Sequence, residues 1–140
     1  MMQITSEQQE KLNKIGGKYD LALILAYGSY ATGKPRADSD LDIAVLDNVK
    51  PDYERFKSLF SEVSDVFPGK NVDLRFLNDA DPFFRYQVIK NKQLLFGQKA
   101  YNEYEIYAFK SYLDDGKKLA KLQKEKVYQT QKLLNQNYYD

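Results

Sequence analysis

The chain has 140 residues, with 21 Lys and Arg against 20 Asp and Glu, so its formal net charge is +1. This length fits one domain with a single sizeable core, because domains commonly span about 100–150 residues. The sequence contains no Cys and no His, which excludes disulfides, Cys/His zinc sites, Cys nucleophiles and a Ser-His-Asp triad. Metal chemistry on carboxylate oxygens remains open.

No apolar run approaches the ~18–20 residues that a membrane-spanning helix needs, and the first residues lack the pattern of a secretory signal. We therefore expect a cytoplasmic protein without a membrane partner. The near-neutral charge also argues against direct binding to duplex DNA, which usually requires a marked basic excess.

The first half of the chain predicts one helix and two buried strands. Thr5-Ser6 precedes a polar stretch that reaches Gly16-Gly17, which predicts a capped helix stopped by glycine. The seven apolar residues 21–27 favour a buried strand. A turn-rich segment over 28–39 then leads into a second buried strand at 41–46.

The middle of the chain continues with both element types. Pro51 predicts the start of a helix, and its apolar residues recur at the i, i+3, i+4 and i+7 spacing of a core-facing stripe. That stripe comprises Phe56, Leu59, Phe60 and Val63. The sequence further predicts a strand at 71–77, a helix over 81–91 with Asp81 as its N-cap, and a short edge strand at 92–97.

A long helical pattern begins at about Asn102. Its broad apolar face is formed by Ile106, Phe109, Leu113, Leu119 and Leu122. Seven of the 12 Tyr follow residue 100, and seven Lys face three acids between Phe109 and Lys132. Tyr is enriched in interfaces, so the sequence leaves open whether this segment packs on the domain or binds a partner.

Two acidic residues at the start of the second strand carry the clearest chemical signal. Asp40 and Asp42 are two positions apart, and such residues point to the same side of a strand about 6.5–7 Å apart. They repel each other unless a divalent cation neutralises them, and oxygen ligands of this kind suit Mg²⁺. Gly28 and Ser29, directly after the first strand, offer close backbone approach and donors for a phosphate. The alternative is that these acids are only turn and strand-end residues in water.

Gly-Ser, ten residues and then Asp-x-Asp resembles the motif of the polymerase-β-like nucleotidyltransferase superfamily. The small size and the run YGSYATG…DSDLDIAVL resemble its minimal (MNT) branch, over about residues 18–97. The resemblance implies an α/β (α+β) fold with a small mixed sheet flanked by helices and a C-terminal helix. It also implies a third carboxylate from a later strand, for which Asp73 is the one acid in a suitable apolar run.

The resemblance assigns roles to these residues. Asp40 and Asp42 would bind two Mg²⁺ ions that hold the phosphates of ATP, the co-substrate. Asp73 would bind the metal on the attacking side and help to activate the acceptor hydroxyl. Gly28 and Ser29 would contact the nucleotide.

Three basic residues are candidates for phosphate contacts. Arg75 shares the strand face of the third acid, as an ion-pair partner or a phosphate ligand. Many relatives carry Arg where this chain has Thr32, so the resemblance assigns the triphosphate contact to Lys34 or Arg36 without deciding between them. The same run fits a P-loop up to Pro35, which replaces the magnesium-binding Ser or Thr.

The resemblance divides the chain into a minimal nucleotidyltransferase domain, 1–98, and a C-terminal helical extension of the same domain, 99–140, as a possible partner-binding element. It implies an antitoxin that transfers AMP from ATP to a tyrosine of a HEPN-domain ribonuclease toxin, in a hetero-oligomer. Two alternatives remain: nucleotidyl transfer to a hydroxyl of a small molecule such as an antibiotic, and a non-catalytic antitoxin that acts by binding alone.

Overall fold

The computed structural model describes residues 2–35 and 38–139, with side chains of the last helix as far as residue 135. In chain order the elements are α1 (Ser6–Lys18), β1 (Leu21–Tyr27), α2 (Ser29–Thr32), β2 (Leu41–Asp47), α3 (Tyr53–Val66), β3 (Val72–Phe76), α4 (Pro82–Lys90), β4 (Lys92–Phe96) and α5 (Gln98–Tyr139). None of the helices in these described ranges combines the length and apolar character required to cross a bilayer.

The four strands form one mixed sheet in the order β3-β2-β1-β4. Strand β1 pairs antiparallel with both β2 and β4, whereas β2 pairs parallel with β3. Strand β4 lies at an edge of the sheet, as the sequence predicts. The α/β fold with a small mixed sheet and a C-terminal helix is therefore confirmed.

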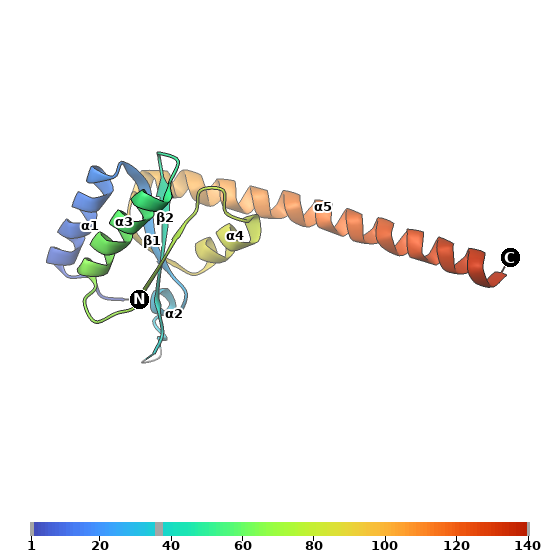
Figure 1. Ribbon diagram of the computed structural model, residues 1–140, viewed down its shortest axis with the longest axis horizontal. Helices are drawn as coiled ribbons and strands as arrows, with labels where there is room; N and C mark the ends of the chain where they lie inside the picture. The colour runs from blue at the N-terminus through green and yellow to red at the C-terminus, as the bar shows by residue number, and fades with distance from the viewer. Residues whose placement is uncertain (1, 36–37, 140) are drawn as a thin grey trace.

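Helices cover both faces of the sheet (Figure 1). One buried cluster joins α1 and α3 to residues such as Ile24, Ile43 and Leu74, and the other joins α4 and α5 to Leu25 and Ala44. Because successive side chains on a strand point to opposite faces, the even-numbered residues of β2 and the odd-numbered residues of β3 face the α4/α5 layer. This alternation sets which side of the sheet receives the predicted acidic residues.

The structure corrects several element boundaries. Helix α1 starts after its N-cap Thr5, as predicted, but it continues through both glycines to Lys18. A Cβ at Gly16 would lie 2.4 Å from the ring of Phe96, so this glycine allows α1 to pack closely on β4 rather than ending the helix. The last helix begins at Gln98, earlier than the apolar pattern indicates.

The predicted apolar stripe of α3 is only partly buried. Leu59 and Val63 are fully buried and Phe56 packs against the same cluster, but Phe60 is 37% exposed and stacks on the ring of Phe56. The second strand also runs one residue further than predicted, to Asp47, which is buried.

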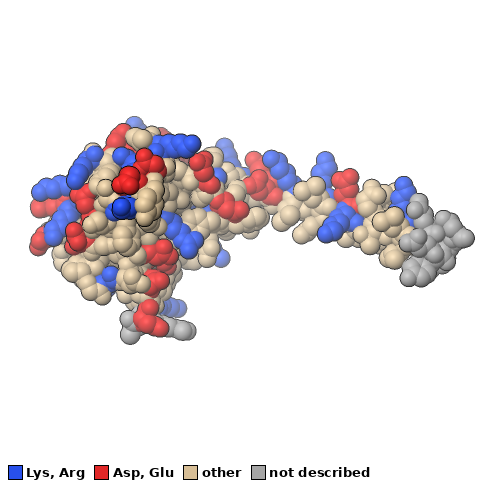
Figure 2. Space-filling model, viewed as in Figure 1, with Lys and Arg blue, Asp and Glu red and all other residues tan. Residues whose placement is uncertain are grey.

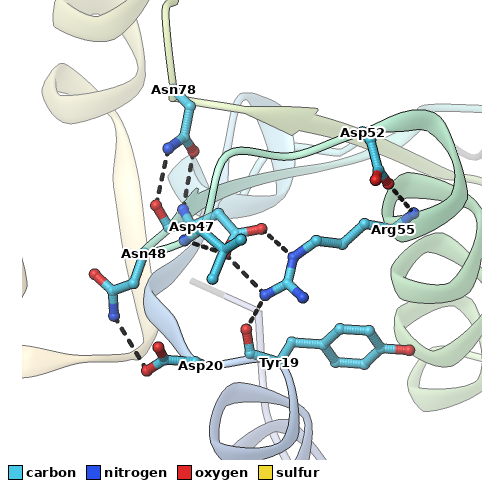
Figure 3. Close-up of polar contacts among 8 residues, drawn as sticks. Tyr19, Asp20, Asp47, Asn48, Asp52, Arg55 and Asn78 are labelled. Carbon is cyan, nitrogen blue, oxygen red and sulfur yellow. Dashed lines mark hydrogen bonds and ion pairs between the residues drawn. The ribbon is translucent and has the colours of Figure 1, made fainter.

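Asp47 forms an ion pair that holds the far end of β2 (Figure 3). Arg55 donates from Nε to Asp47 Oδ2 at 2.6 Å and from Nη2 to Oδ1 at 2.9 Å, and it also donates to the carbonyl of Tyr19. The Asn78 side chain accepts from the backbone N–H of Asp47 and donates to its carbonyl. These bonds connect α3, β2 and the turn after β3, so they fix the strand that carries the candidate site.

Candidate active site

A tight turn after β1 forms one side of the candidate site. Gly28 has φ +74° and ψ −149°, a conformation that residues with a Cβ essentially do not adopt. The chain then forms the single turn α2, after which the backbone N–H of Lys34 donates to the carbonyl of Ser29 at 3.0 Å. A Cβ on Gly28 would lie 2.5 Å from Oδ2 of Asp42, so the turn and this carboxylate are in close contact.

Asp42 and Asp73 are direct neighbours across the parallel pair β2–β3. Burial, followed by the negative charges of Asp73 and Asp40, raises the pKa of Asp42, while the positive charge of Arg75 lowers it in part. The predicted acidic residues therefore interact electrostatically at one end of adjacent strands. Such an arrangement favours binding of a cation, which would relieve the repulsion.

Asp40 lies just before β2, and its side chain is committed to another partner. Asn71 Nδ2 donates to Asp40 Oδ1 at 2.8 Å. Within the described residues, no three acidic side chains are close enough in this arrangement to hold a metal ion together. An ion shared by all three acids would require their side chains to move closer together, and Asp40 can keep Oδ1 on Asn71 while it offers Oδ2, because a carboxylate has two acceptor oxygens. The donor set itself, carboxylates alone, suits Mg²⁺.

Arg75 lies beside the acidic pair, as expected for a residue two positions after Asp73. Its Nε is 3.7 Å from Asp73 Oδ2, and its guanidinium lies over the ring of Phe84 at 5.5 Å. Lys34 is exposed, and Arg36 lies outside the described residues. The described residues after this turn enter β2 rather than a long helix, which agrees with Pro35 in arguing against a P-loop.

Three residues of the site are missing from the sequence-based prediction. Tyr27 pairs with Asp42 across β1–β2, and burial, together with the charge of Asp42, raises its pKa to about 12. Phe84 contacts the Tyr27 ring edge-on at 5.8 Å, and Asn71 binds Asp40. Tyr27 ends an apolar run and Asn71 precedes a strand, so only the strand pairing reveals their neighbours.

A strand-end carboxylate pair facing a glycine turn, on a mixed sheet with helices on both faces, is the arrangement that the resemblance to nucleotidyltransferases predicts. Residues 10–101 match the family described as Polymerase beta, Nucleotidyltransferase. The match spans more than half of the chain, and the chain belongs to this family. No curated protein sequence gives a significant match.

Solved structures share the fold over most of the chain. A mutant of the MntA–HpeT toxin–antitoxin pair matches with a TM-score of 0.69 at 22% identity, covering 85% of this chain and 98% of that one. A toxin–antitoxin structure with AMP-PNP matches with a TM-score of 0.66 at 25% identity, covering 88% and 98%.

A third structure contains a tri-AMPylated HEPN toxin of Shewanella oneidensis in complex with an MNT antitoxin. It matches with a TM-score of 0.61 at 24% identity, covering 86% of this chain and 98% of that one. The predicted nucleotidyltransferase family is thus confirmed, as is the fold shared with these toxin–antitoxin structures. Transferase activity is the function that this family supports.

Proposed function

We propose that this protein is an antitoxin that transfers AMP from Mg-ATP to a tyrosine hydroxyl of a HEPN-domain ribonuclease toxin and so neutralises it. The observation that carries the proposal is the pairing of Asp42 with Asp73 across β2 and β3, beside the turn at Gly28. Solved relatives with the same fold add the context of toxin–antitoxin complexes, one with AMP-PNP and one with an AMPylated toxin.

In this proposal, the carboxylates of Asp40, Asp42 and Asp73 would hold Mg²⁺, Asp40 through the oxygen that does not accept from Asn71. The bound metal would stabilise negative charge on the ATP phosphates during displacement. The turn at Gly28 and Ser29 would contact the phosphates through its backbone, with Lys34 or Arg36 as the further cation.

The transfer step itself involves the acceptor tyrosine and two side chains of this chain. The tyrosine oxygen of the acceptor attacks the α-phosphorus of ATP, the bond to pyrophosphate breaks, and Asp73 takes up the hydroxyl proton. Arg75, 3.7 Å from Asp73 and stacked on Phe84, would orient that carboxylate. The added AMP places negative charge on the toxin surface, which opposes RNA binding by like-charge repulsion.

Mass spectrometry of the HEPN protein after incubation with this chain and Mg-ATP tests the proposal. We expect added AMP, which is lost with EDTA and in the double variant Asp40→Asn with Asp42→Asn. Retention of AMP transfer in that double variant would refute the proposed site. Full neutralisation of the toxin by the double variant would instead favour an antitoxin that acts by binding alone.

A further inference from the structure

Most of the apolar face predicted for the C-terminal helix is not packed on the domain, although its Phe109 lies against Tyr86 of α4. Helix α5 contacts the body through the buried Tyr101, Tyr104 and Ala108, and through Tyr112, whose ring stacks on Tyr86 at 4.0 Å. It then projects beyond the sheet as a single helix (Figure 1). The predicted face is exposed instead, with Ile106 59% and Leu113 43% accessible.

The exposed side of α5 carries an uninterrupted seven-residue repeat. Apolar residues recur at every seventh position as Ile106, Leu113, Ala120, Val127 and Leu134. The positions three residues after the first four of these are also uncharged, namely Phe109, Gly116, Gln123 and Thr130. We call these nine residues the α5 seam. This 3–4 spacing forms one stripe along a helix and is the pattern of a coiled-coil contact.

Ile106 and Phe109, at the start of the seam, line a groove with Tyr86 of α4, whose ring lies 6.4 Å from that of Phe109; from Leu113 onward the seam lies away from the side of α5 that faces the body. On a seven-residue repeat, the buried Tyr101, Tyr104 and Ala108 occupy positions on the other half of the helix. The seam spans about 42 Å at a rise of 1.5 Å per residue. A helix of this length exposing an apolar stripe gains stability mainly from tertiary contacts rather than from its intrinsic propensity. A partner for the seam is therefore expected.

The charges beside the seam indicate what that partner is. Lys110, Lys117 and Lys124 form a row along one edge, at intervals of seven residues. In an antiparallel pair of two copies, this lysine row would face itself and like charges would repel. In a parallel pair, only one of the three lysines would meet an acid, Glu105. Figure 2 shows charged side chains with uncharged surface between them along this part of α5.

We propose that the α5 seam is the docking surface for an amphipathic helix of another protein, with an apolar stripe and acidic residues at its edge. This partner is identified as the HEPN toxin, an identification that rests on the proposed function. The seam would then be a binding surface for the acceptor protein that is separate from the strand-end carboxylates. Gly116 would permit close approach of the two helices. Apart from its own helix backbone and chain neighbours, no described atom lies within 4 Å of a Cβ added at this position.

Titration calorimetry with the purified HEPN protein of the proposed toxin–antitoxin pair tests the proposal. The full chain carries Asp40→Asn and Asp42→Asn so that binding is measured without AMP transfer. Leu113→Asp with Val127→Asp places two charges on the seam, and Leu122→Asp is the matched control on the other half of the same helix, where Leu122 is 63% exposed. All three positions are exposed, and circular dichroism would verify that each variant remains folded.

We expect the seam variant to bind at least about 30-fold more weakly, as for loss of a hot-spot residue, with the control within about threefold of the parent. Lys117→Glu with Lys124→Glu should also weaken binding, because it removes the complementary charge. Equal affinities for the seam variant and the parent would overturn the proposal. A chain that is a dimer on its own and becomes a monomer in the seam variant would also overturn it. So would binding of single-stranded RNA to the lysines of α5, if the HEPN protein did not bind the seam.

AMP transfer by the catalytically intact chain separates this inference from the proposed function. Docking through the seam without any added AMP would refute the function and leave the docking surface standing. Added AMP together with unchanged affinity of the seam variant would refute the docking surface and leave the proposed function standing. If the HEPN protein neither bound nor gained AMP, both would be wrong.

Discussion

The contact between Gly28 and Asp42 gives a direct way to test how the turn and the carboxylate depend on each other. Alanine at position 28 would hold a Cβ at φ +74°, ψ −149°, a strained conformation that costs about 1–3 kcal/mol of unfolding free energy. The new methyl group would lie 2.5 Å from Asp42 Oδ2, where ordinary contact begins at 3.4 Å, so the carboxylate must move by about 1 Å.

A displacement of about 1 Å in a catalytic group can lower the rate about 100-fold, so we expect Gly28→Ala to lose AMP transfer by that order. Urea unfolding would give the stability change, and AMP transfer would be measured where the variant is fully folded. Gly69→Ala is the matched control, because Gly69 also has positive φ (+80°) but nothing within 4 Å of an added Cβ. We expect it to lose about 1 kcal/mol and to keep its rate. Gly28→Ala with the parent's rate would refute the reasoning, as would an equal loss of rate in both variants.

Two further predictions concern the opposite ends of β2. The raised pKa of Asp42 means that ionisation of this carboxyl destabilises the folded state; the cost is absent below the unfolded pKa of 3.8 and complete above the raised folded pKa. Asp42→Asn should therefore raise the melting temperature in EDTA at pH 7 but not near pH 3. Thermal scans without an increase at pH 7 would contradict this. Arg55→Ala leaves the carboxylate of Asp47 buried without its cation, so urea unfolding should show a loss of about 3–5 kcal/mol in the free energy of unfolding. Lys11→Ala removes an exposed ion pair with Glu7 and should change the free energy of unfolding by less than about 1 kcal/mol.

The sequence predicted the strands well because they depend on local patterns, and a run of seven apolar residues at 21–27 is more typical of a buried strand than of a helix. The two-residue spacing did not fix the orientation of Asp40, because this residue lies just before β2 and its side chain accepts a hydrogen bond from Asn71. Gly16 misled the prediction because its role lies in the approach of Phe96, 80 residues away along the chain. The same limit hid Tyr27, whose partner Asp42 is known only once the register of β1 and β2 is known.

The C-terminal helix shows a different limit of sequence reasoning. An exposed apolar stripe and a buried one have the same periodicity, so the pattern around Leu113 could not reveal whether the domain or another protein covers it. The structure decides this for the domain, because the ring contacts of α5 with α4 reach Tyr112 while the repeat continues to Leu134.

Strand β2 carries acids of two different kinds, and their surroundings account for the difference. Asp47 is more deeply buried than Asp42, yet its charge is matched by Arg55 through two hydrogen bonds, so it stabilises the fold. At the other end, Asp42 is less buried but faces Asp73 and Asp40, and exposed Arg75 offsets their effect only in part. Strand β2 is therefore held firmly at the end where Arg55 neutralises Asp47, while its other end keeps excess negative charge. This combination is what a metal-dependent transferase requires, because the ligands must be held in position without being neutralised by the protein itself.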